Sequence, residues 1–157
     1  MPDWVGHILF ALILCEIGRV KKGEMRALVV LGALLPDIVS KAHLLGFFLP
    51  FNAEQMFLFF HPTAHSLLGA FLLALIASGL FVYDQKKAFL LLSIGSVSHI
   101  LADMTNRFFV YGPIHVWLPF SFQSTFAGLF WSDEYLYQIL LFLVLYMALL
   151  AVKGWKR

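Results

Sequence analysis

The sequence contains little cysteine and little charge. Cys15 is the single cysteine among 157 residues, which excludes an internal disulfide and a cysteine-based zinc finger, so a metal site would need histidine and carboxylate ligands. Only 13% of the residues are charged, and the net charge of +2 comes from cations scattered along the chain. Because nucleic-acid binding requires a clustered basic face, we expect no nucleic-acid partner.

Several catalytic and targeting signatures are also missing. The chain has no Gly-x-Ser-x-Gly elbow, no Walker loop and no His-Glu-x-x-His motif, so an intramembrane metalloprotease fits poorly. No basic segment precedes the first apolar run, because the chain starts Met1-Pro2-Asp3-Trp4 and the first cations follow at 19–22. This order favours a retained membrane segment over a cleaved signal peptide.

Apolar residues are abundant instead. They make up 61% of the chain, and the mean hydropathy is +0.86, which is outside the usual range of soluble domains. Apolar runs near the length of a membrane-crossing helix lie at about 4–18, 26–49, 62–83, 88–103 and 135–152. The sequence therefore predicts one integral membrane domain over 1–157, an all-α polytopic helix bundle with about five transmembrane helices.

The distribution of basic residues predicts an orientation for these spans. Nine cations fall on one side of the five expected helices: Arg19, Lys21, Lys22, Arg26, Lys86, Lys87, Lys153, Lys156 and Arg157. Only Lys41 and Arg107 fall on the other side. By the positive-inside rule, the N-terminus is expected outside and the C-terminus in the cytoplasm. Glu16, Glu24 and Asp84 are expected to be ordinary interfacial charges.

The most unusual apolar stretch is 95–103, which sets His99 and Asp103 four residues apart. On a helix this spacing puts both side chains on one face, one turn apart. Ionisable groups at membrane depth are costly, and they therefore mark candidate functional sites. In the predicted topology all six histidines lie on the outer side, and His7, Asp37 and His65 are the expected partners.

Depth along the helices indicates which of these groups can meet. His7, Asp37 and His99 each lie 11 or 12 residues from the nearest inner cation, which corresponds to about 16–18 Å of helical rise. The same count puts Asp103 at about 24 Å and His65 at about 31 Å. We therefore expect a vertical pocket that opens to the outer side.

The chemistry of these side chains points to a metal site. Histidine nitrogens and carboxylate oxygens are the ligands of zinc and similar divalent ions. A metal would also supply the positive charge that makes buried carboxylates tolerable as anions. A single buried histidine is more often a hydrogen-bonded packing residue, but four or five such groups on four helices favour a metal. The predicted ligands are His7, Asp37, His65, His99 and Asp103.

Five other polar residues receive secondary roles. His61 is a further candidate for a ligand or for a residue that supports one. Asp3, one turn before the first histidine, is either a ligand or a partner that orients that imidazole. Arg107 could hold a phosphate oxygen of a substrate, or it could be an ordinary interfacial arginine. His43 and His115 are nearer to packing roles.

Five short motifs occur in an order that resembles a known family. They are Met1-Pro2-Asp3-Trp4…His7, Gly32-Ala33-Leu34-Leu35-Pro36-Asp37, His61…His65-Ser66, Gly95…Ser98-His99…Asp103 and Tyr111-Gly112…Trp117-Leu118-Pro119-Phe120-Ser121. Over about residues 1–125 the chain resembles the membrane-bound metal-dependent hydrolase family of LexA-binding, inner-membrane-associated hydrolases. More distantly, its ligand pattern is similar to that of zinc-dependent phospholipase C and P1 nuclease enzymes.

The resemblance implies a helical inner-membrane protein with a metal site. Position by position, it marks the metal set as His7, Asp37, His65, His99 and Asp103, with His61 beside it. The chain departs from the family at Pro62, because the family commonly has an arginine there and one more residue between the two histidines. Pro62 is instead expected in the first turn of a helix, where a missing N–H does no harm.

These features together predict a membrane-embedded hydrolase that uses one or two divalent ions, with zinc as the first choice. The expected substrate is a phosphoester, such as a lipid head group, at the outer face, and membrane lipids are the expected partners. The oligomeric state is left open. The alternatives are a metal or proton transporter and a partner-binding membrane scaffold with a structural metal. Transport needs polar access from both sides, which the inner halves of the spans offer little of.

Overall fold

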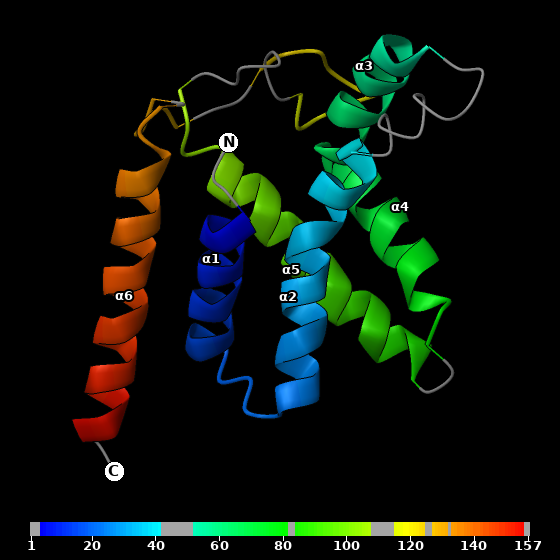
Figure 1. Ribbon diagram of the computed structural model, residues 1–157. Coiled ribbons are helices and arrows are strands. Elements are labelled where there is room, and N and C mark those ends of the chain that lie inside the picture. The colour runs from blue at the N-terminus through cyan, green and yellow to red at the C-terminus, as the bar shows by residue number, and fades with distance from the viewer. Residues whose placement is uncertain are drawn as a thin grey trace.

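The computed structural model describes residues 4–41, 52–81, 84–107, 115–124, 127–131 and 133–155. These residues form six α-helices (Figure 1): α1 (Trp4–Ile17), α2 (Gly23–Ser40), α3 (Ala53–Ala64), α4 (Leu67–Ser78), α5 (Gln85–Asp103) and α6 (Tyr135–Trp155). Extended pairing in the described residues is limited to one isolated bridge between Asn106 and Phe130. The predicted all-α class is therefore confirmed.

The prediction of about five transmembrane helices is wrong. Within the described residues, only α6 is long and apolar enough to cross a membrane, over Tyr135–Lys153. The helices α1 and α4 are apolar but span only 14 and 12 residues, whereas a crossing needs about 20. The apolar run 62–83 does not form one helix, because the chain breaks between α3 and α4. The predicted orientation of the termini is derived from five spans, so it loses its basis as well.

The break between α3 and α4 also corrects the expected helix start. Pro62 lies inside α3, near its end, and not in a first turn. The helix that follows is capped by Ser66, whose Oγ accepts a hydrogen bond from Gly69 N at 3.0 Å and donates one to Thr63 O at 2.8 Å. Such a cap satisfies a backbone N–H that the first helical turn leaves without a partner. His65 therefore lies in a corner between two helices.

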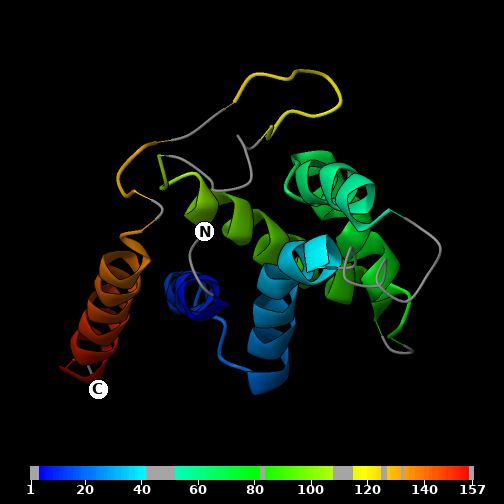
Figure 2. The same ribbon diagram turned by 45° about the horizontal axis from the view of Figure 1, so that its top comes forward.

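The helix α5 is the centre of the bundle and packs against α1, α2 and α4. Figure 2 shows α5 crossing α2, and the two backbones touch where Gly32 of α2 meets Gly95 of α5. A Cβ added to Gly95 would lie 2.7 Å from Ala33 N, and one added to Gly32 would lie 2.8 Å from Leu92 Cα. Small residues at this crossing therefore let the two helices approach closely.

A buried ionic network joins three helices at the C-terminal end of α1. The Glu16 carboxylate, with an exposed fraction of 8%, lies 2.7 Å from Arg26 of α2 and 2.6 Å from Lys153 of α6. Arg26 also donates a hydrogen bond to the Tyr146 hydroxyl at 3.2 Å. The expectation that Glu16 is an ordinary interfacial charge is wrong, because its partners bury it between α1, α2 and α6.

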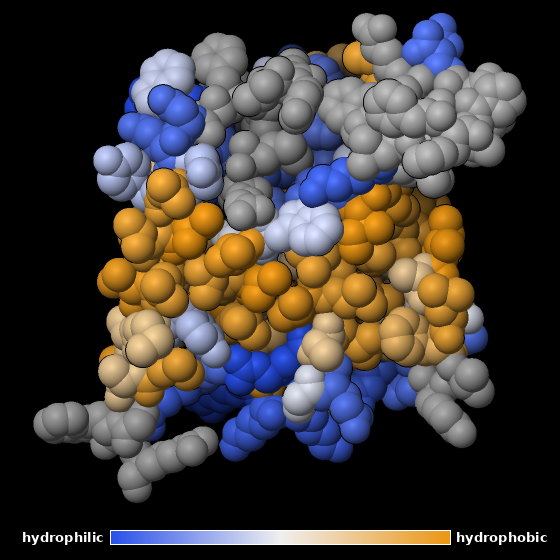
Figure 3. Space-filling view, in the orientation of Figure 1, coloured by the Kyte–Doolittle hydropathy of each residue, from blue (hydrophilic) through white to orange (hydrophobic). Residues whose placement is uncertain are grey.

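Much of the apolar surface faces outward. Figure 3 shows an apolar band across this face of the molecule, between two more hydrophilic ends. Large exposed side chains come from several helices, including Ile76 of α4 at 71%, Leu90 of α5 at 60% and Val144 of α6 at 63%. A contiguous apolar exterior marks contact with lipid or protein, because water disfavours it. The fold thus has an apolar exterior around a polar interior site.

Candidate metal centre

The structure brings the five predicted ligands together from four segments. His7 lies in the first turns of α1, Asp37 in the last turn of α2, and His65 directly after α3. His99 and Asp103 lie in the last two turns of α5, one turn apart as their spacing predicts. Asp37 is 5% exposed and the other four are fully buried. The cluster is therefore inside the bundle.

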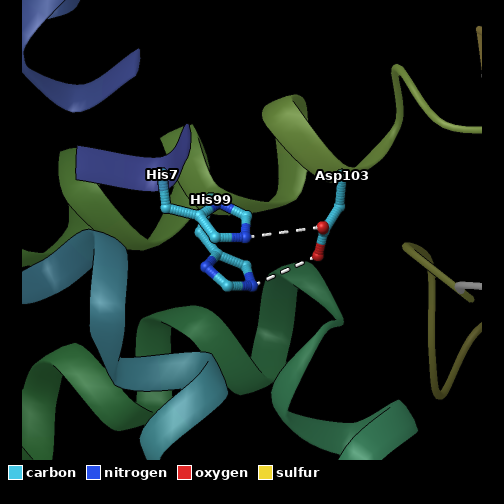
Figure 4. Close-up of side chains that lie close together, drawn as sticks. All are labelled: His7, His99 and Asp103. Atoms are coloured by element: carbon cyan, nitrogen blue, oxygen red, sulfur yellow. Dashed lines mark ion pairs between the residues drawn. The ribbon is translucent and has the colours of Figure 1, made fainter. Parts of the chain in front are cut away.

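Asp103 is the centre of this cluster. Its Oδ1 lies 3.6 Å from His7 Nε2, and its Oδ2 lies 3.2 Å from His99 Nε2 and 3.6 Å from His65 Nε2. Figure 4 shows the His7 and His99 rings turned toward this carboxylate. The two rings stack with centroids 3.7 Å apart. Asp37 Oδ1 completes the cluster, at 3.6 Å from His65 Nε2 and 3.9 Å from His99 Nε2.

Two overlapping groups in this cluster have the spacing of metal ligands. One consists of His7, His99 and Asp103, and the other of Asp37, His65 and His99, with the ligand atoms of each group within 4.8 Å of one another. Both groups use His99 Nε2, whose single lone pair can bind one ion. Two ions would therefore have to divide the ligands unequally, because only one of them could take His99 Nε2.

Backbone carbonyls fix the tautomers of two imidazoles. His99 Nδ1 lies 2.7 Å from Ala33 O, and His65 Nδ1 lies 2.8 Å from His61 O. A carbonyl only accepts, so each Nδ1 carries the proton in these hydrogen bonds, and Nε2 presents its lone pair to the cluster. Ser40 Oγ, which donates to Pro36 O at 2.8 Å, lies 3.3 Å from His65 Nδ1. This is the arrangement that metal-binding histidines need.

Five polar atoms at the centre lack hydrogen bonds. Within the described part of the chain, no partner is found for Nε2 of His7, His65 and His99 or for either carboxylate oxygen of Asp103. Buried polar atoms are normally paired, because an unpaired one costs about 1–3 kcal/mol. Divalent cations bound at the two ligand groups would provide partners for these atoms. Protonation of an imidazole would instead leave an ion pair with the aspartates.

Burial and neighbouring charges shift the pKa values of these groups in different directions. Burial lowers the pKa of His7 to about 3 and that of His61 to about 4, so both imidazoles are neutral at pH 7. Burial would raise the pKa of Asp103, but the imidazoles of His99 and His7 outweigh it and lower that pKa. Burial would lower the pKa of His99, but the Asp103 carboxylate outweighs it and raises that pKa. A carboxylate beside neutral imidazoles suits a metal, whereas the His99 shift also suits an ion pair.

The secondary histidine and aspartate candidates are not all part of this cluster. The His61 ring is 5% exposed and lies 4.4 Å from the His65 ring, outside both three-residue groups. The His115 ring faces the edge of Phe122, with centroids 6.1 Å apart. Asp3 and His43 lie outside the described residues. His61 therefore supports the cluster through its carbonyl, and His115 packs elsewhere.

Arg107 is held by groups other than the cluster. Its Nε donates a hydrogen bond to Gly128 O at 2.6 Å, and its guanidinium carbon lies 5.2 Å from the centre of a Trp131 ring. The side chain is exposed. The predicted phosphate role of Arg107 stays a prediction.

Sequence reasoning missed two groups that orient the cluster. The Ala33 carbonyl accepts from His99 Nδ1, and Ser40 lies beside His65 Nδ1. A backbone carbonyl carries no side-chain signal, so it could not be read from the sequence. Ser40 could have been found, because it follows Asp37 by three residues and such pairs share a helix face.

An all-α chain with an apolar exterior and a buried histidine–aspartate cluster belongs to the class of helical membrane proteins with a candidate metal centre. A family model described as YdjM inner membrane protein matches residues 1–157. The chain therefore belongs to the YdjM inner membrane protein family, and the prediction of an inner-membrane protein is confirmed. That description mentions neither hydrolysis, nor LexA, nor zinc phospholipases. No curated protein and no solved structure matched the chain.

Proposed function

We propose that this inner-membrane protein binds one or two divalent ions, zinc first, and hydrolyses a phosphoester such as a lipid head group. The observation that carries the proposal is the set of facing, buried ligand atoms without hydrogen bonds on His7, His65, His99 and Asp103. The contacts of His65 and His99 Nδ1 with backbone carbonyls leave Nε2 as the ring atom of each that faces the cluster. Three nitrogens and two carboxylates form a donor set that suits zinc.

The chain's own residues have distinct roles in this proposal. His65 and His99 present oriented Nε2 atoms, and Asp103 turns its two oxygens toward different histidines. Zinc held there would lower the pKa of a bound water and stabilise negative charge on a phosphoryl oxygen. Arg107 is the proposed contact for a second phosphate oxygen, because its exposed guanidinium could make charge-assisted hydrogen bonds.

Exposed aromatic side chains favour a lipid substrate. Val116 O accepts a hydrogen bond from Leu67 N at 2.9 Å, which attaches the segment 115–124 beside the corner that holds His65. This segment exposes Trp117 at 53%, Phe120 at 86% and Phe122 at 72%. Aromatic side chains are enriched where a membrane meets water. The segment could therefore hold the site against the head groups of a bilayer.

The distribution of cations supports an outward-facing site. The cluster is built from the start of α1 and the ends of α2 and α5, whereas the cations gather at the other ends of these helices (Figure 1). They are Arg19, Lys21, Lys22, Arg26, Lys86 and Lys87. Cytoplasmic ends of membrane proteins carry an excess of such residues. We therefore place the site, as a proposal, toward the outer side of the inner membrane.

Metal analysis of the purified chain in detergent tests the metal centre. We expect one or two zinc ions per wild-type chain, and less than half of that amount in single alanine variants of the five ligands. His115→Ala is the matched control, because His115 contacts Phe122 and lies outside the cluster, and it should keep the wild-type amount. A wild-type protein without stoichiometric metal, or full metal content in His99→Ala, would overturn the proposal.

Hydrolysis needs its own assay. The metal-loaded protein should release phosphate or a phosphorylated head group from phospholipid vesicles, and chelation followed by zinc should remove and restore this activity. Metal uptake into sealed vesicles without hydrolysis would replace the hydrolase by a transporter. Bound metal with no exchangeable water and no hydrolysis would replace it by a scaffold with a structural ion.

A further inference from the structure

A second cavity lies at the end of the bundle opposite the histidine–aspartate cluster. It has a volume of about 440 Å³ and lies between the first turns of α2 and of α5, with Phe81 among its lining residues. This volume is within the range of small-molecule sites. Its walls share no residue with the candidate metal centre. The cavity therefore needs an explanation of its own.

The cavity is polar at one end and apolar at the other. Glu24 lies in the first turn of α2, while Asp84 caps α5 and Lys87 follows in its first turn. Farther along the two helices the walls are formed by Leu28, Leu31 and Leu91. The seven residues from Glu24 to Leu31 correspond to about 10 Å of helix. The shape thus suits an elongated ligand with one polar end and one apolar end.

The charges at the polar end define the head group. Two carboxylates and one ammonium face the cavity, and all three side chains are exposed. Among the described residues, the Lys87 ammonium and the Glu24 carboxylate form no ion pair with each other or with Asp84. Within the cavity lining itself, a purely anionic head group would face two carboxylates and one ammonium. A head group with its own ammonium would match both signs.

The lining also distinguishes between a primary and a quaternary ammonium in the head group. A primary ammonium donates three hydrogen bonds, which carboxylates accept, whereas a quaternary ammonium cannot donate and is typically held by a cage of aromatic rings. Among the described residues that line this cavity, Phe81 is the one aromatic side chain. The lining therefore favours a primary ammonium.

We propose that this cavity binds one ethanolamine phospholipid of the membrane. Lys87 holds the phosphate, Glu24 and Asp84 hold the ammonium, and one acyl chain lies along Leu28 and Leu91. The occupant is a lipid because the chain belongs to an inner-membrane family and because Leu31, at the apolar end of the cavity, is 38% exposed on the exterior. The site is independent of the metal centre, so either proposal can fail alone.

Thermal unfolding of the full chain in detergent, with added lipid, measures this binding. Phosphatidylethanolamine, phosphatidylglycerol and phosphatidylcholine with identical acyl chains are titrated separately. We expect the ethanolamine lipid to raise the melting temperature most and to saturate at one lipid per chain. Equal effects of the three lipids would overturn the assigned head group, and no saturable effect of any lipid would overturn the site.

Matched variants separate specific binding from general solvation by lipid. Ala27 is exposed and lines the cavity, so Ala27→Phe should fill it and abolish the lipid-dependent shift. Ala148→Phe places the same side chain on the exposed face of α6 and should leave the shift unchanged. An unchanged shift in Ala27→Phe would overturn the proposal. Both variants should keep the wild-type metal content.

A second pair of variants tests the phosphate contact. Lys87→Gln should weaken ethanolamine-lipid binding about fivefold, which is the effect of one lysine near a lipid surface. Lys86→Gln is the control, because Lys86 is the exposed neighbour that does not line the cavity. Equal affinities for the two variants would overturn the role of Lys87.

Discussion

Alanine at Gly95 tests whether the crossing of α2 and α5 sets the geometry of the candidate metal centre. A Cβ at this position would lie 2.7 Å from Ala33 N and 2.8 Å from Gly32 Cα, with the Val29 carbonyl oxygen closer still. These neighbours are backbone atoms, which cannot rotate away as a side chain would. The two helices must therefore separate.

The size of the effect follows from these distances. Ordinary Cβ contacts begin at 3.4 Å, so relief of the Ala33 N contact alone requires a separation of about 0.7 Å, and the closer Val29 carbonyl oxygen requires more. The hydrogen bond from His99 Nδ1 to Ala33 O, now 2.7 Å, would then lengthen to about 3.4 Å and lose most of its strength. Overpacking of this kind costs about 1–3 kcal/mol. The imidazole would also lose the contact that orients its Nε2.

Two assays on Gly95→Ala follow from this reasoning. The melting temperature in detergent and the zinc content per chain should both fall. Gly23→Ala is the control, because a Cβ at Gly23 meets nothing within 4 Å, and it should behave as the wild type. If Gly95→Ala keeps the melting temperature and the metal content of Gly23→Ala, the crossing does not position the site.

Three further predictions concern the network, the anchoring of α6 and the metal. Glu16→Gln should lower stability by about 1–2 kcal/mol, because Lys153 loses its carboxylate partner. The hydrogen bond from Lys153 lowers the Glu16 pKa. The wild type should therefore be more stable than Glu16→Gln above about pH 4.3, and this difference in stability should disappear as the pH falls below that value. A difference in melting temperature that is independent of pH would refute this. Gln138→Leu removes hydrogen bonds to Ala102 O at 3.2 Å and to the Thr105 hydroxyl at 2.6 Å, so proteolysis should release α6 faster than in the wild type, and an unchanged rate would contradict the anchoring role. Chelation should lower the wild-type melting temperature. The loss corresponds to about 2.7 kcal/mol if the metal was present at a hundredfold above its Kd. Chelation should leave the melting temperature of His99→Ala unchanged, and equal shifts in both proteins would refute a stabilising metal at His99.

The membership of the histidine–aspartate cluster could be predicted from the sequence. Ionisable groups in apolar runs are stable only where they meet one another or a ligand, so few arrangements were open to His7, Asp37 and His99. The helical spacing of His99 and Asp103 fixed their shared face. Whether these residues bind a metal stays a prediction, because the same groups also form ion-pair contacts.

The number of spans and the depth of His65 could not be predicted in this way. Counting residues treats an apolar run as one straight helix, and this count put His65 far above the other ligands at about 31 Å. The chain instead breaks at Ser66, and the corner brings His65 Nε2 to 3.6 Å from Asp103 Oδ2. A hydropathy profile records the apolar residues on both sides of such a corner. It does not record the capping hydrogen bonds that form the corner.

The sequence by itself determined the all-α class, the strongly apolar character of the chain and the exclusion of an internal disulfide, because these depend on composition and on helical spacing. Only the tertiary structure decided how the cluster is oriented and where the helices end. The Ala33 carbonyl meets His99 because Gly32 and Gly95 let two backbones touch. Glu16 is buried because two cations from other helices reach it. Contacts between helices depend on where the helices cross, and that register is written in no single segment of the chain.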